Sequence, residues 1–204
     1  SRGVKTVGMA QAQTHIDAAL ALAPESSVVH LWKGKVLEAQ GDDVGAQKAE
    51  ASYNQAIALD EHNYDAHVAL SQLLIAHKRV EEGIAILAPV EDAARSDPRL
   101  ANTLGDAYLR APQFVKAEEW FRTALAIEAA NEATVVDALA NLGVALESQG
   151  RAAEAIAQLE AAHKRAGGQR EDVALRLALA YERADLFDYA SALFEKLLAP
   201  GGDK

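Results

Sequence analysis

The sequence has 204 residues, 50% of them hydrophobic, and a formal net charge of −10 at pH 7. That length suffices to bury a substantial core, whereas the acidic balance argues against nucleic acid or an anionic membrane as the principal partner. No hydrophobic run is long enough to cross a bilayer, and the Ser-Arg-Gly start lacks the hydrophobic core of a signal peptide. The absence of cysteine excludes disulfides, thiolate catalysis and cysteine-based zinc sites.

The first predicted element is a single amphipathic helix. Abundant alanine with little glycine and proline favours helix throughout the chain. Residues 1–10 show no readable pattern, but Ala12, Ile16 and Ala19 recur at helical spacing before Pro24. Because helix pairs follow, we assign residues 1–26 to a partial repeat that consists mainly of its second helix.

From residue 27 onward a pair of helices recurs five times. In each pair the first helix carries a small residue between bulky hydrophobic ones, and the second carries a stripe at i, i+4 and i+7. The small residues stand at 34, 71, 105, 143 and 178, so their spacings are 37, 34, 38 and 35 residues. The predicted repeats, which we expect to form one continuous domain, are 27–63, 64–97, 98–131, 132–169 and 170–204.

The longer spacings and one proline define the irregular points of the pattern. The extra residues fall at 42–44 and 132–135, where three or four residues add about one helical turn without moving the stripe to another face. Pro89 lies inside a predicted second helix and should kink it or split it in two. Ser96 or Asp97, followed by Pro98, predicts the start of the next helix.

Residues 98–131 contain the clearest pair. Its first helix contains Leu104, Gly105 and Tyr108, and after a break at Pro112 its second helix contains the stripe formed by Ala117, Phe121 and Ala124. Small residues at 105 and 117 allow close approach of the two backbones, while the two aromatic rings fill the wedge around them. This order resembles the tetratricopeptide repeat, whose period is about 34 residues, and the resemblance extends over nearly the whole chain.

The resemblance implies an all-α fold, a right-handed superhelical α-solenoid of antiparallel helix pairs whose stability comes from stacking neighbours. It also implies that first helices line a concave groove and second helices form the outside. Isolated polar residues on first helices are also compatible with ordinary solvated surface, whereas Trp32 lies off the internal stripe and is a candidate interface anchor. The candidate partner-binding residues are Val28, Leu31, Trp32, Lys35, Val68, Gln72, Ile75, Arg99, Asn102, Asp106, Leu109, Arg110, Asn141, Val144, Glu147, Leu175, Arg176, Leu179 and Arg183.

Two of these residues suggest a more specific binding site, a carboxylate clamp, but the residues at the other clamp positions argue against it. Asn141 and Arg176 occupy places that resemble the carboxylate clamp with which some tetratricopeptide proteins hold the C-terminus of a chaperone. Asn102, Asp106 and Asp172 stand where that clamp needs a basic residue, an asparagine and a basic residue. Two acidic groups would repel a terminal carboxylate, so we interpret the sequence as lacking this clamp.

No pattern in the sequence predicts catalysis or metal binding. The six histidines form no His-x-x-Glu or His-x-x-x-His pair, and we expect His30 and His67 to be packed and hydrogen-bonded. The paired carboxylates Glu81-Glu82 and Glu118-Glu119 begin second helices, where we expect them to face water. No glycine-rich phosphate loop follows a strand. We therefore expect no enzymatic activity, no cofactor and no metal site.

The function that fits this reading is a non-catalytic scaffold, binding a peptide or helical segment of a partner protein in its concave groove. By family resemblance we expect an assembly factor of a bacterial multiprotein complex, with no nucleic-acid partner and no direct membrane insertion. The alternatives are a targeting or regulatory module of a larger enzyme and a self-assembling structural array. We expect a cytoplasmic location, with the bacterial periplasm as the alternative.

The two ends of the repeat pattern lack the capping helices that a solenoid needs. A terminal repeat of a solenoid needs a polar outer helix, but Phe194, Leu197 and Leu198 are followed by no further capping helix, and the helix ending near Pro24 lacks most of its partner. We therefore expect a module of a longer protein, or self-association through uncapped ends.

Overall fold

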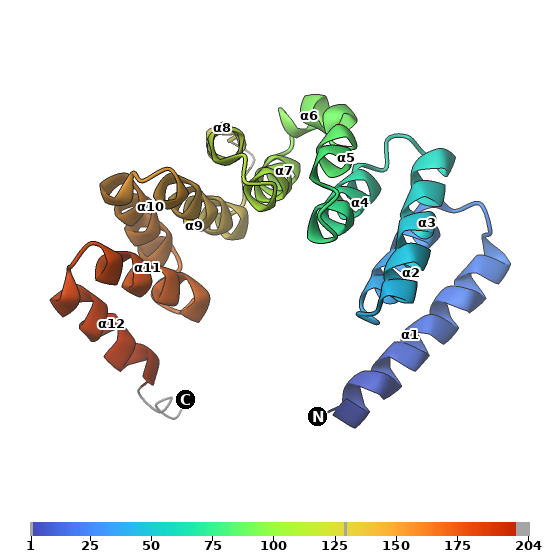
Figure 1. Cartoon of the computed structure of the whole chain (residues 1–204), viewed down its shortest axis with the longest axis horizontal. Helices are drawn as coiled ribbons and strands as arrows, with labels where there is room; N and C mark the ends of the chain where they lie inside the picture. The colour runs from blue at the N-terminus through green and yellow to red at the C-terminus, as the bar shows by residue number, and fades with distance from the viewer. Residues whose placement is uncertain (1, 129, 199–204) are drawn as a thin grey trace. The chain divides into compact units, whose positions relative to one another are not determined.

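The computed structural model describes residues 2–128 and 130–198, which form twelve α-helices and no strand. The chain divides into two compact units, Ser1–Val90 and Glu91–Lys204, so that the division falls inside α6 (Ala88–Ala94). Figure 1 shows the helices in chain order. The all-α class with helix pairs as its building blocks is confirmed.

In the first unit, α1 precedes two helix pairs. α2 packs on α3 and α4 packs on α5, while α3 also contacts α4 and α1 contacts α2. The turns between paired helices are short, so the members of a pair run antiparallel. The helices are α1 (Arg2–Leu22), α2 (Ser27–Glu38), α3 (Asp43–Leu59), α4 (Tyr64–Ala76) and α5 (Val80–Ala85).

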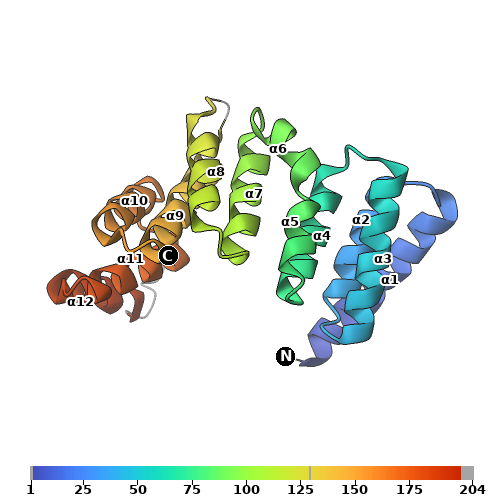
Figure 2. The same cartoon turned by 45° about the horizontal axis from the view of Figure 1, so that its top comes forward.

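The second unit contains three complete pairs. α7 packs on α8, α9 on α10 and α11 on α12, and each pair contacts the next through α8 with α9 and α10 with α11. Figure 2 shows α7 and α8 side by side. The helices are α7 (Pro98–Arg110), α8 (Phe114–Ala126), α9 (Glu132–Ser148), α10 (Ala152–Arg165), α11 (Glu171–Arg183) and α12 (Phe187–Leu198).

The predicted irregularities are confirmed. α5 ends at Ala85 and α6 begins at Ala88, so the second helix that contains Pro89 is split in two. α3 and α9 have 17 residues each, against 13 in α7 and α8, as expected if the extra residues lengthen helices. Asp97 caps α7, its Oδ1 accepting hydrogen bonds from the backbone N–H groups of Arg99 at 2.9 Å and Leu100 at 3.0 Å.

Close approach within the pairs depends on the small residues of the first helices. A Cβ atom at Gly105 would lie 2.6 Å from Cε1 of Phe121, and one at Gly34 would lie 2.3 Å from Cε1 of Tyr53. At Gly143 the nearest atom would be Cγ of Leu159, at 2.7 Å. No side chain fits at these distances, which confirms that the glycine is what lets each bulky residue lie against the facing backbone.

Each unit has its own hydrophobic core. Tyr53 belongs to the core of the first unit and Leu159 to that of the second, and both are fully buried. Tyr53 Oη donates a hydrogen bond of 2.6 Å to Glu38, and Tyr181 Oη donates one of 2.6 Å to Glu160. Burial, followed by the hydrogen bond to a carboxylate, raises the pKa of both phenols, so both remain protonated donors at neutral pH.

Candidate functional site

First helices carry the exposed side chains that are candidates for binding. We define two patches, one in each unit. The α2 patch consists of Val28, Trp32 and Lys35. The α9–α11 patch consists of Asn141, Val144, Glu147, Leu175, Arg176, Leu179 and Arg183.

The α2 patch is hydrophobic, and a cation lies beside its ring. Val28 and Trp32 lie one helical turn apart, 58% and 53% exposed, although tryptophan is usually well buried. Lys35 Nζ lies 4.8 Å from the centroid of the Trp32 ring, within cation–π range. On α4, the candidate residue Gln72 is half-buried. The exposed ring therefore offers an anchor surface that this chain leaves largely uncovered.

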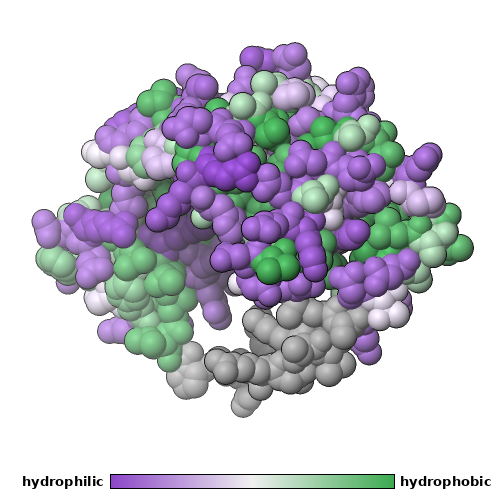
Figure 3. Space-filling view, turned by 45° about the vertical axis from the view of Figure 1, so that its right-hand side comes forward, coloured by the Kyte–Doolittle hydropathy of each residue, from purple (hydrophilic) through white to green (hydrophobic). Residues whose placement is uncertain are grey.

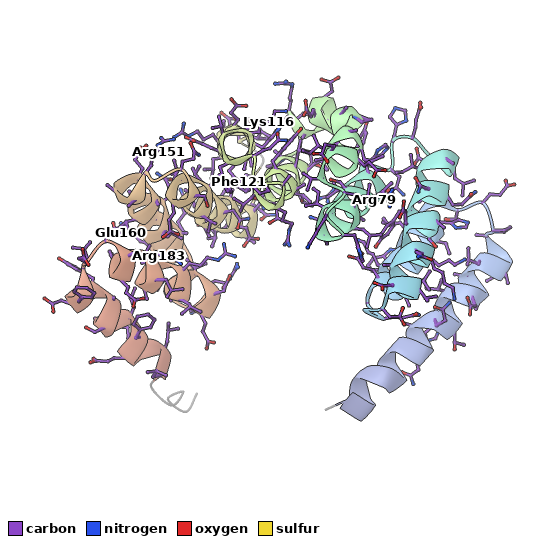
Figure 4. The ribbon with its side chains drawn as sticks, in the orientation of Figure 1. Arg79, Lys116, Phe121, Arg151, Glu160 and Arg183 are labelled. Atoms are coloured by element: carbon purple, nitrogen blue, oxygen red, sulfur yellow. The ribbon has the colours of Figure 1, made fainter. Side chains whose placement is uncertain are left out.

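In the α9–α11 patch, polar side chains link the two first helices, and hydrophobic side chains lie beside these links. Arg176 donates a hydrogen bond of 2.9 Å to Asn141, and Arg183 donates one of 2.6 Å to Glu147. Leu175 is 46% exposed. Val144 and Leu179 are half-buried. Figure 4 labels Arg183 on α11. These links fix the orientation of the arginine side chains before any partner binds.

The adjacent helix α7 contributes five of the predicted residues. Arg110 Nε donates a hydrogen bond of 2.8 Å to Asp106 one turn earlier on the same helix. Asn102 is half-buried, and its Oδ1 is a buried oxygen without a hydrogen-bond partner. Leu109 is half-buried and Arg99 is exposed. α7 contacts α9, so these side chains lie on the helix next to the α9–α11 patch.

Three predicted groove residues are buried, and the prediction is wrong for them. Leu31 belongs to the hydrophobic core of the first unit. Ile75 is buried because it rests on Gly83, where a Cβ atom would come within 2.7 Å of its Cγ1 atom. Val68 is buried on α4, most of whose side chains are covered. These residues contribute to stability rather than to a binding surface.

The structure places a fixed negative charge where the clamp hypothesis needs a basic residue. Arg170 forms a hydrogen bond of 2.8 Å with Asp172 and an ion pair of 3.0 Å with Asp137. The Arg170 hydrogen bond, which outweighs desolvation, lowers the pKa of Asp172 to about 2. Asn141 and Arg176 do meet, but a terminal carboxylate on this end of α11 would face the ionised Asp172.

The sequence reasoning missed a link that recurs between second helices. Arg151, the residue that precedes α10, binds Glu154 three residues later at 2.6 Å and Glu118 of α8 at 2.7 Å. Arg79, which precedes α5, binds Glu82 at 2.8 Å and Glu50 of α3 at 2.8 Å. Both arginines are labelled in Figure 4. An Arg-x-x-Glu pair at the start of a second helix, with a glutamate one repeat earlier, was the available signal.

The expectation that Glu118 faces water is wrong. Its side chain is only 6% exposed and accepts hydrogen bonds from Gln149 at 2.8 Å and Arg151 at 2.7 Å, with Arg122 paired at 2.8 Å. Burial by itself raises the pKa of this carboxyl, but the hydrogen bonds and the two arginine charges together lower it below its ordinary value. Glu118 is therefore a buried carboxylate that joins α8 to the next repeat.

Histidine packing follows the prediction. His67 is buried, its Nδ1 lying 3.2 Å from the Ile86 carbonyl oxygen and its Nε2 3.0 Å from that of Glu61. His30 is half-buried, with Nε2 2.9 Å from the Pro24 carbonyl oxygen.

Within residues 2–128 and 130–198, no group of three or more histidine, aspartate or glutamate side chains is arranged to hold a metal ion. In the same part of the chain, no helix is both long and hydrophobic enough to span a membrane.

Helix pairs that repeat with a small residue of the first helix against a bulky residue of the second define a helical-repeat solenoid. The family model for the tetratricopeptide repeat matches residues 46–105, from within α3 to Gly105. Residues 46–105 therefore match the tetratricopeptide repeat, and the remaining helix pairs have the same architecture on both sides of the matched segment. No curated protein matches the sequence.

Solved structures share the fold at low sequence identity. PilW, described as a widely conserved type IV pilus biogenesis factor, is 18% identical with a TM-score of 0.77, over 96% of this chain and 87% of that one. PilF of Pseudomonas aeruginosa is 17% identical with a TM-score of 0.71, over 89% and 78%. YrrB, described as having an unusual peptide-binding site, is 16% identical with a TM-score of 0.56, over 90% of each chain.

Proposed function

We propose that this protein is a non-catalytic scaffold that binds a peptide or helical segment of a partner protein on its first-helix side. The observation that carries the proposal is Trp32, which is 53% exposed and forms the α2 patch with Val28. An exposed tryptophan with a cation over its ring offers a large, rigid contact area, and such residues dominate binding energy at protein interfaces. In the second unit, the α9–α11 patch offers a candidate surface of its own, with oriented arginines beside the exposed Leu175.

The kind of partner that we propose follows from the same surfaces and from the similar structures. Hydrophobic anchors flanked by both charges suit a polypeptide segment. The peptide-binding site named for YrrB and the pilus biogenesis role named for PilW support an assembly factor of a bacterial multiprotein complex. We propose the cytoplasm as its location, with the bacterial periplasm as the alternative.

Alanine substitutions test this surface on a partner identified by pull-down and purified. Trp32→Ala and Arg176→Ala are each expected to weaken binding by about tenfold or more, since truncation of an interface anchor costs ~2 kcal/mol. Isothermal titration calorimetry gives the affinities. Val115→Ala and Arg165→Ala are matched controls, because both side chains are exposed on second helices.

The controls are expected to change affinity by less than about twofold, as residues outside an interface do. Unchanged affinity in both test variants, together with a loss in the controls, would move the binding site to the second-helix side.

A further inference from the structure

An open cleft of about 700 Å³ lies in the first unit among α1, α2 and α3. Its lining includes Gln13 from α1, Lys33 from α2 and Lys48 from α3. Among the residues whose side chains the structure describes, no carboxylate lines it, although the chain as a whole carries a net charge of −10. Its volume is in the range of ligand-binding clefts. The cleft therefore combines binding-site size with a local charge opposite to that of the protein.

The cleft lies where two other repeat junctions carry an arginine–glutamate link. Glu118 and Glu50 each follow the first small residue of a second-helix stripe and pair with Arg151 and Arg79. The equivalent position in α1, directly after Ala12, is Gln13. The link is therefore absent at this junction, and the space beside α3 is open.

The polar groups around the cleft have unused bonding capacity. Gln13 Oε1 is buried and accepts no hydrogen bond, while its Nε2 donates one of 2.9 Å to Asp17 on the same helix. Among the described residues, neither Lys33 nor Lys48 forms an ion pair. A buried acceptor without a partner costs free energy that a donor from a ligand would recover.

Figure 3 shows a largely hydrophilic surface with separate hydrophobic areas, viewed with the right-hand side of Figure 1 forward. The two lysines that line the cleft make charge the basis on which it selects a ligand. A ligand for this cleft needs negative groups for the two ammonium groups and an N–H donor for Gln13 Oε1. A polypeptide that contains aspartate or glutamate supplies both, the donor coming from its backbone.

We propose that the cleft among α1, α2 and α3 binds an acidic peptide segment, as a site separate from the first-helix patches. Side-chain carboxylates of the segment pair with Lys33 and Lys48, and a backbone N–H of the segment donates to Gln13 Oε1. The site takes its selectivity from charge, so its affinity falls as ionic strength rises.

Fluorescence anisotropy of a labelled oligoglutamate peptide at low ionic strength tests the proposal on the whole chain. We expect saturable binding that an oligoglutamine peptide of equal length does not show. The double variant Lys33→Glu/Lys48→Glu is expected to weaken oligoglutamate binding by about tenfold or more, because it turns two attractions into repulsions. Circular dichroism checks that the variant retains its helix content.

Three further variants separate this site from unspecific attraction and from the α2 patch. Lys78→Glu/Lys116→Glu changes the net charge equally at exposed positions outside the cleft and is expected to alter binding by less than about twofold. Gln13→Leu leaves the charge unchanged and is expected to weaken binding about fivefold, for the loss of one hydrogen bond. Trp32→Ala should bind the peptide as the wild type does.

Equal losses in the two lysine double variants would overturn the proposal, as would indistinguishable binding of oligoglutamate and oligoglutamine. Should Lys33→Glu/Lys48→Glu fail to fold, the Gln13→Leu comparison decides: unchanged oligoglutamate affinity in that variant would contradict the cleft as the site. Loss of oligoglutamate binding in Trp32→Ala would place the peptide on the α2 patch instead.

Discussion

Gly105→Leu is expected to lower the free energy of unfolding by about 2–3 kcal/mol, in the upper part of the range for overpacking. The reason is the 2.6 Å that would separate even a Cβ atom at this position from Cε1 of the fully buried Phe121. The side chain of leucine can be accommodated only if α7 and α8 separate, which loses contact along the whole pair. Urea denaturation followed by circular dichroism measures the change.

The direction of the change in stability distinguishes a steric conflict from an effect of helix propensity. Leucine is a better helix former than glycine by ~0.8 kcal/mol, so without a steric conflict the substitution would stabilise α7. Ala153→Leu on the exposed side of α10 is the matched control and should leave stability within about 0.5 kcal/mol. An unchanged or higher stability of Gly105→Leu would show that residue 105 does not face Phe121.

A double substitution identifies the contact itself. Phe121→Ala alone is expected to cost about 3–5 kcal/mol, as for other fully buried phenylalanines. In that background the ring that blocks position 105 is gone, so Gly105→Leu should cost less than it does alone. Independent, additive costs would contradict direct contact. Because repeats are stabilised by their neighbours, we expect the destabilisation to spread to α9 and α10.

The sequence correctly predicted those features that depend on the spacing of residues within one helix pair. The glycine at 105 and the stripe through Phe121 recur with a period close to one helix pair, so they indicated both the helices and their contact. Pro89 lacks a backbone N–H, and this local property was enough to predict the split between α5 and α6. Such features depend only on residues within one pair.

The misassigned residues depend on neighbours that spacing does not reveal. Ile75 occupies a position that is glutamate in three of the other four repeats, and its burial follows from the missing side chain at Gly83. Glu118 begins a second helix, like the solvent-exposed Glu81. Its burial depends on Gln149 and Arg151, which lie 31 and 33 residues further along the chain. Contacts between residues so far apart in the sequence depend on how successive repeats stack on one another.

Glu118→Ala is expected to lower the free energy of unfolding by about 2 kcal/mol. Breaking a fully buried ion pair costs ~3–5 kcal/mol, and the cost is smaller here because Arg122 and Arg151 retain contact with water. The isosteric Glu118→Gln keeps the packing but loses the charge, so about 1 kcal/mol is expected. Glu119→Gln changes the adjacent exposed carboxylate and should stay within about 0.5 kcal/mol.

The dependence of the free energy of unfolding on pH in the acid range provides a second test of Glu118. Since the folded state lowers the pKa of Glu118, the unfolded chain binds a proton more readily, near its ordinary pKa of about 4.3. The stabilisation by the carboxylate is therefore fully present above that value and is lost as the pH falls toward the folded pKa. Over the range from pH 6 down to below about pH 4.3, the wild type should lose its advantage over Glu118→Gln, whereas its difference from Glu119→Gln should remain small throughout. A difference between wild type and Glu118→Gln that is the same at both ends of this range would contradict an ionised, buried Glu118 as the link between α8 and the next repeat.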